Sequence, residues 1–258
     1  MTLAATAGGI SQGNAGAIIA ATLDASATAG IALAAANNAV TGNLIGTVTA
    51  NATGGGVAVF SRDALTVGSG GVTATGAVAL TGTSLSLEDV VSASGQTVTL
   101  RATDGGISQL AAGAITAATL DASATAGIAL ATANNAVTGN LIGTVTANAT
   151  GGGVAVFSRG ALTVGSGGVT ATGAVALTGT SLSLEDVVSA SGQTVTLRAT
   201  TGDISQLADA AITAGTLDAG AVTGISSPPR TTPCPATPST ASPPAPPVAA
   251  SRSSRAAG

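Results

Sequence analysis

The feature that most constrains this chain is a long internal repeat. The tripeptide Ile-Ser-Gln begins at residue 10 and recurs at residues 107 and 204, so both intervals are 97 residues (107 − 10 and 204 − 107). Residues 10–106 and 107–203 differ at seven positions and therefore match at 90 of 97 (97 − 7). A chain that repeats itself in this way is expected to stack similar structural units rather than fold around one compact core.

A shorter apolar pattern recurs inside each repeat. Segments in which two apolar residues flank a small or polar one begin at Ile31, Val57, Val78, Val98 and Ile128. Their spacings of 26, 21, 20 and 30 residues add up to 97, which predicts four turns of about 24 residues per repeat. That length is typical of solenoid proteins.

Each turn is predicted to hold three short strands, because three period-two segments fit between successive starts. The segments of three successive turns begin at Ile31, Val40 and Val48, at Val57, Leu65 and Val72, and at Val78, Leu85 and Val91. The segments Gly54-Gly55-Gly56 and Gly68-Ser69-Gly70-Gly71 are predicted corners, where glycine tolerates a positive φ.

The sequence therefore predicts an all-β protein, a right-handed parallel β-helix over residues 1–225. It consists of the repeats 10–106 and 107–203 and a partial repeat 204–225. The predicted inward residues are Val57, Val59, Val78, Leu80, Val98 and Leu100, with their equivalents 97 positions later. A helix over the alanine-rich residues 15–36 is a competing local interpretation, since alanine is the best helix former.

Composition excludes several classes of function. Only 7% of residues are charged and 1% aromatic, His, Trp and Tyr are absent, and the net charge is −4. Nucleic-acid binding lacks both the basic cluster and the stacking rings it needs. The mean hydropathy of +0.55 comes from Ala and Val, and polar residues interrupt every apolar stretch, so no transmembrane segment is predicted.

No catalytic, cofactor-binding or metal-binding residue is predicted, and the chain is not expected to be an enzyme. The only paired carboxylates, Glu88-Asp89 and Glu185-Asp186, are adjacent residues that point apart and are interpreted as solvated corners. Asp63 of the pair Arg62-Asp63 is replaced by Gly160 in the second repeat. A polysaccharide-processing β-helix and an ice-binding solenoid are weaker alternatives. The ice-binding alternative depends on Thr-x-Thr pairs, which are Thr47/Thr49, Thr73/Thr75, Thr81/Thr83 and Thr97/Thr99.

Residues 226–258 have a different composition. This segment of 33 residues holds all nine prolines and no acidic residue, Leu, Ile or Phe. It is predicted to be disordered, since it cannot bury a core. A shifted reading frame is the hypothesis for its origin, and its single cysteine, Cys234, cannot form an intramolecular disulfide.

The tandem Gly-Val-Ala-Val, Thr-Val-Thr-Leu-Arg and Gly-Asp-Ile-Ser-Gln units resemble the repeats of filamentous-haemagglutinin-like exoproteins, the large β-strand-repeat proteins of Gram-negative bacteria. The resemblance covers residues 1–225. It implies a structural and adhesive segment of a cell-surface or secreted adhesin, active in adhesion, aggregation or biofilm formation through multivalent weak contacts with host surfaces or with itself. The parent protein is then expected outside the cell or on the outer membrane. This chain lacks the signal peptide and the Asn-rich secretion motifs of the family, which puts its own export in doubt. A non-functional truncated gene remnant is the alternative.

Overall fold

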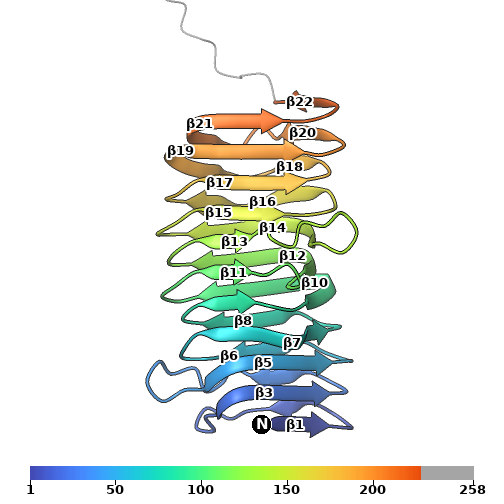
Figure 1. Ribbon diagram of the computed structural model, residues 1–258, viewed down its shortest axis with the longest axis vertical. Coiled ribbons are helices and arrows are strands. Elements are labelled where there is room, and N and C mark those ends of the chain that lie inside the picture. Colours follow the sequence, from blue (N-terminus) through green and yellow to red (C-terminus); the bar gives the residue numbers. More distant parts are fainter. Residues whose placement is uncertain (228–258) are drawn as a thin grey trace, which may run out of the picture. The chain divides into compact units, whose positions relative to one another are not determined.

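The computed structural model describes residues 1–227, which form a β-solenoid of parallel strands without any helix (Figure 1). The predicted all-β parallel architecture is confirmed. The helix considered for residues 15–36 is wrong, because that segment contains a strand, Ile19–Ala27, whose side chains alternate between the interior and solvent. The predictions for the proline-rich segment lie outside the described residues from 228 onward.

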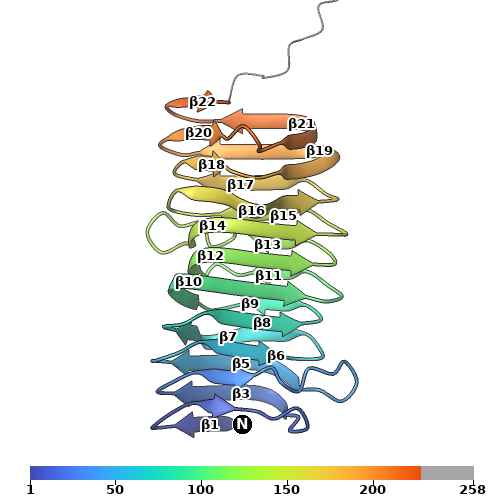
Figure 2. The same cartoon turned by 180° about the vertical axis from the view of Figure 1, so that it is seen from behind.

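The strands form two ladders, and each turn of the chain contributes one strand to each ladder. The odd ladder contains β1 (Thr2–Ala5), β3 (Ile19–Ala27), β5 (Leu44–Ala52), β7 (Leu65–Ala74), β9 (Leu85–Leu87), β11 (Ile107–Gln109), β13 (Ile128–Leu130), β15 (Val154–Phe157), β17 (Val175–Gly179), β19 (Val188–Ala199) and β21 (Ile212–Gly220). The even ladder contains β2 (Ile10–Ser11), β4 (Ile31–Leu33), β6 (Val57–Phe60), β8 (Val78–Gly82), β10 (Val91–Ala102), β12 (Ile115–Ala124), β14 (Leu141–Ala149), β16 (Leu162–Ala171), β18 (Leu182–Leu184), β20 (Asp203–Gln206) and β22 (Gly224–Ser226). The two ladders lie on opposite sides of a stack of about ten turns (Figures 1 and 2).

Each turn has one long and one short strand over most of the stack, where three short strands were predicted. The long strand β7 shows how two predicted segments join. Val48 pairs with Val67 and Ala50 pairs with Val72, so five residues of β7 span the space of two on β5. The bulge includes Gly70 and Gly71, whose φ angles are +99° and +67°. Residues 68–71 therefore form the predicted bend with positive φ, although the bend lies within one continuous strand.

In the turn that follows this bulge, the three predicted segments pair separately with the neighbouring turn. Residues 65–67 of β7 pair with β9, and residues 72–73 pair with the first part of β10. The second part of β10 pairs with β8. The segment predicted at Val40 is wrong, because Val40 lies in a loop with 75% of its surface exposed.

The 97-residue repeat spans four and a half turns instead of the predicted four. Leu23 stacks under Val48, Val67 and Leu87 in successive turns of the odd ladder. A fourth turn reaches Gln109, still in the odd ladder. Leu120, which is 97 residues after Leu23, lies in the even ladder between Val98 and Val145. The second repeat is therefore displayed on the opposite side of the stack from the first.

The error in the predicted period lies in its last step. The steps from Ile31 to Val57, from Val57 to Val78 and from Val78 to Val98 are register pairs and are confirmed. Val98, however, pairs with Leu120, and Ile128 pairs with Ile107 of the odd ladder. Both ladders use the same apolar–small–apolar pattern. The pattern alone therefore does not show whether a segment lies one turn further along the same ladder or on the opposite side of the stack.

The core is a narrow column of stacked aliphatic side chains. All twelve predicted inward residues are at most 1% exposed, so the predicted core is confirmed. The long strands bury Leu or Val together with Ala, as in Leu23, Ala25 and Ala27. Stacking like residues every 4.7–4.9 Å fills a thin interior closely, and this explains why the core needs no aromatic ring. Phe60 and Phe157 occupy outward-facing positions at the ends of β6 and β15.

The bulge in β7 leads to a test with a matched control. Gly71 and Gly95 both have positive φ, but a Cβ at Gly71 would lie 2.4 Å from the Val90 carbonyl oxygen, whereas nothing lies within 4 Å of a Cβ at Gly95. We expect Gly95→Ala to lower the free energy of unfolding by about 1–2 kcal/mol, the cost of a left-handed alanine. Gly71→Ala should cost about 1–3 kcal/mol more because of the added overpacking. Urea denaturation of the full chain measures both, and equal effects would show that the bulge does not constrain the stack.

Candidate functional site

The outward residues of β1, β3, β5 and β7, the first four strands of the odd ladder, form a polar grid. Thr22 stacks under Thr47, Asp24 under Thr49, and Ser26 under Asn51. We call this surface the odd face and define it by the outward residues Thr2, Thr22, Asp24, Ser26, Thr47, Thr49, Asn51, Thr66 and Thr73. These residues alternate with the buried Leu, Val and Ala residues, so the β-strand period alone separates core from surface.

The same grid recurs on the even ladder in β10, β12, β14 and β16. We call it the even face, defined by the outward residues Thr97, Thr99, Arg101, Thr119, Asp121, Ser123, Thr144, Thr146, Asn148, Thr163 and Thr170. Thr97, Thr119, Thr144 and Thr163 form one unbroken row along the stack, at about 4.8 Å per turn. The threonines that are irregular along the sequence are thus regular in space.

Most side chains of the grid have no protein partner. In the described part of the chain, the hydroxyls of Thr97, Thr119, Thr144 and Thr163 make no hydrogen bond to another protein group and are half-buried. The hydroxyls of Thr49 and Thr146, in contrast, each donate to a carbonyl in the bulge of the next turn, at 3.0 Å. The row at Thr97 is therefore available to hydrogen-bond with water or a ligand.

A shallow groove lies at the end of each grid. On the odd face it has a volume of about 220 Å³ and is lined by Ser26, Asn51, Thr28 and Thr53, among others. The equivalent groove on the even face has about 240 Å³ and includes Arg101. The Thr28 hydroxyl donates to the carbonyl of Gly8, so this row also joins successive turns.

The paired acids stabilise turns of the backbone. Asp89 accepts hydrogen bonds from the backbone N–H groups of Gly70 (2.9 Å) and Val90 (2.7 Å), which lower the pKa of its carboxyl group. Asp186 accepts the equivalent bonds from Val187 and Gly167, with the same direction of pKa shift. Within residues 1–227 there is no group of three or more His, Cys, Asp or Glu that could hold a metal ion.

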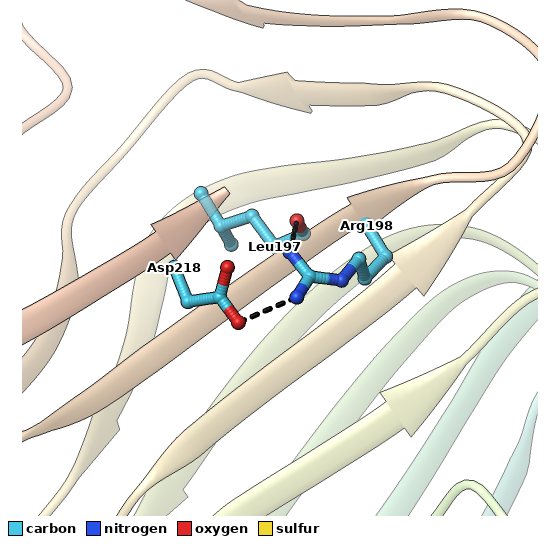
Figure 3. A network of polar contacts seen from close by, with 3 residues as sticks. All are labelled: Leu197, Arg198 and Asp218. Carbon is cyan, nitrogen blue, oxygen red and sulfur yellow. Dashed lines mark hydrogen bonds and ion pairs between the residues drawn. The ribbon is translucent and has the colours of Figure 1, made fainter. Parts of the chain in front are cut away.

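The grid begins again on the odd ladder in β19, at the end of the second repeat, and in β21, in the partial third repeat. One ion pair joins these two turns. Arg198 Nη2 donates to Asp218 Oδ2 at 2.5 Å, as Figure 3 shows. The guanidinium holds the pKa of the Asp218 carboxyl below its ordinary value. Both side chains are about half exposed, so the pair adds little to stability.

Sequence reasoning missed a buried amide network in each repeat. Asn140 is fully buried, and its Oδ1 accepts hydrogen bonds from Gln109 Nε2 (2.7 Å) and the Ile115 N–H (2.8 Å). Its Nδ2 donates to Gln109 Oε1 and to the Leu130 carbonyl. The first repeat has the equivalent pair, Asn43 and Gln12. The recurrence of Gln in each Ile-Ser-Gln tripeptide was the available signal.

The networks anchor two loops, residues 34–43 and 131–140. Asn38 Oδ1 accepts hydrogen bonds from the N–H groups of Val40 and Thr41, which form a tight turn at the tip. The exposed Asn37-Asn38 and Asn134-Asn135 pairs therefore lie in loops. The loops project from opposite edges of the stack in both views (Figures 1 and 2). Their positions again reflect the half-turn between the two repeats.

The chain matches no known family profile, no curated protein and no solved structure. Within residues 1–227, no helix is long and apolar enough to span a membrane.

The amide network predicts a large effect of one substitution. Asn140→Ala removes the partners of the Gln109 side chain, the Ile115 N–H and the Leu130 carbonyl. Because a buried unsatisfied group costs about 1–3 kcal/mol, we expect a loss of at least about 3 kcal/mol in the free energy of unfolding. Asn134→Ala, in the exposed part of the same loop, should change it by less than about 0.5 kcal/mol. Denaturant titration of both variants checks this, and similar stabilities would contradict a structural role for Asn140.

Proposed function

We propose that this chain is a structural and adhesive segment of a bacterial cell-surface or secreted adhesin. The observation that carries the proposal is the recurrence of one hydroxyl-rich face on both sides of a regular stack. Such a scaffold holds the same weakly interacting groups at fixed intervals. No catalytic, cofactor or metal role is assigned to any residue.

The energetics of the grid suit multivalent adhesion. A hydrogen bond between an exposed hydroxyl and a ligand replaces bonds to water, so each contact contributes only about 0.5–1.5 kcal/mol. Linked contacts raise the overall affinity without requiring any single strong site. In this proposal the parent protein acts outside a Gram-negative cell, and its partners are host surfaces or other copies of itself.

Ice binding, a weaker alternative from the sequence, gains one supporting observation. The unbroken row of Thr97, Thr119, Thr144 and Thr163 is the kind of regular array that this alternative requires. The same face carries Arg101 and Asp121, whose charges bind their own hydration water. We therefore retain adhesion as the proposed function.

Adhesion can be measured with the full chain coated on polystyrene beads. We expect bead attachment to cultured epithelial cells, and clumping of the beads, to rise more steeply than linearly with coating density, because contacts are multivalent. Beads coated with serum albumin at equal density are the control. Attachment and clumping no greater than this control at every density would contradict the proposal and favour a gene remnant without a ligand.

A further inference from the structure

We propose that the odd and even faces each bind a neutral polyhydroxylated polymer, a polysaccharide, and that the solenoid bridges two such polymers. The inference rests on the proposed adhesive function and adds a ligand class and a geometry to it. The observation behind it is that the two repeats are offset by half a turn, so that two equivalent faces lie on opposite ladders.

The chemistry of the faces selects a neutral ligand rich in hydroxyl groups. Hydroxyls and amides both donate and accept hydrogen bonds, as do the hydroxyl groups of a sugar. The odd face has a single charged residue, Asp24, and on the even face Arg101 and Asp121 balance each other. Neither face has the basic cluster that would hold an anionic polymer.

The geometry selects a polymer over a small sugar. The free row from Thr97 to Thr163 crosses four consecutive turns, which is a length of roughly 14 Å at about 4.8 Å per turn. A ligand of one or two sugar units would reach few of these groups, and each contact contributes little in water. An extended chain lying along the row contacts side chains from every turn.

The two faces cannot serve the same polymer segment. Leu23 and Leu120, the equivalent core residues behind the two faces, belong to opposite ladders. The outward side chains of β5 and β14 therefore project away from each other across the core. Two repeats on the same side would increase affinity for one polymer, whereas this arrangement links two polymers.

The test uses two layers of dextran, a neutral soluble glucan. Full chain is bound to dextran on a sensor surface, and fluorescent dextran is then added as a second layer. We expect wild-type protein to capture the second layer. A variant of the even face, Thr119→Val, Thr144→Val and Asn148→Val, should still bind the surface through the odd face but capture at least tenfold less second-layer dextran.

Two further variants make the result specific. Adding Thr22→Val, Thr47→Val and Asn51→Val, the equivalent changes on the odd face, should lower binding to the surface at least tenfold. The control variant Thr116→Val and Thr178→Val removes outward hydroxyls whose register partners belong to neither face, and it should behave as wild type. Far-UV circular dichroism and denaturation midpoints must match wild type for all variants.

Three outcomes would overturn the inference. Wild-type protein that binds neither dextran nor microcrystalline cellulose lacks the proposed ligand class. Retention in growing ice without binding to either glucan would assign the faces to ice. Second-layer capture by the even-face variant would show that bridging does not require opposite faces. If wild-type protein binds neither glucan while beads coated with it still adhere to cells, the adhesive function stands and this inference alone fails.

Discussion

In-register stacking of aliphatic side chains between parallel strands is the interaction on which the rest of this structure depends. Each inward Leu, Val, Ile or Ala contacts its equivalent about 4.8 Å above and below, as in the column from Leu23 through Val48 and Val67 to Leu87. Because every turn is the neighbour of two others, the core keeps the same narrow cross-section however long the stack becomes. A chain with 7% charged and 1% aromatic residues can therefore bury a complete core.

The same register determines what the surface presents. Inward and outward residues alternate, so a repeated core requires a repeated exterior, and the Thr, Ser and Asn rows follow from that alternation. The strands that carry the bulges at Gly70-Gly71 and Gly167-Gly168 pair with strands of both ladders. After each bulge, the long strands therefore belong to the other ladder. The repeat of 97 residues consequently ends half a turn out of phase with its beginning. Equivalent surfaces then face opposite directions, a geometry suited to linking separate partners.

The fold and core were predictable from the sequence because period-two alternation is a strong local signal. Val57, Val59, Val78 and Leu80 are buried as predicted, and the register steps between Ile31 and Val98 are correct. The half-turn was not predictable, because Val98-Thr99-Leu100 has the same pattern as segments of both ladders. Only the pairing of Val98 with Leu120 distinguishes them.

The outward grid was only partly foreseeable. Thr-x-Thr pairs were visible in the sequence, but the rows they belong to were not. Threonines that stack on each other are 19 to 25 residues apart, because the loops between turns differ in length. The Asn140–Gln109 pair, 31 residues apart, was equally hidden. Its members become neighbours only because one turn stacks on another.

The half-turn offset can be tested by disulfide trapping in a background carrying Cys234→Ser. Thr99 and Asp121 are register partners on adjacent turns, within the Cα separation that a disulfide requires. Oxidation of the variant Thr99→Cys with Asp121→Cys should give an intramolecular disulfide, detected by peptide mapping. The variant Thr99→Cys with Ala129→Cys should remain reduced within the monomer, because Ala129 lies in the odd ladder beside Ser108. A disulfide in the second variant and none in the first would show that one repeat contains four whole turns, which would contradict the structure presented here.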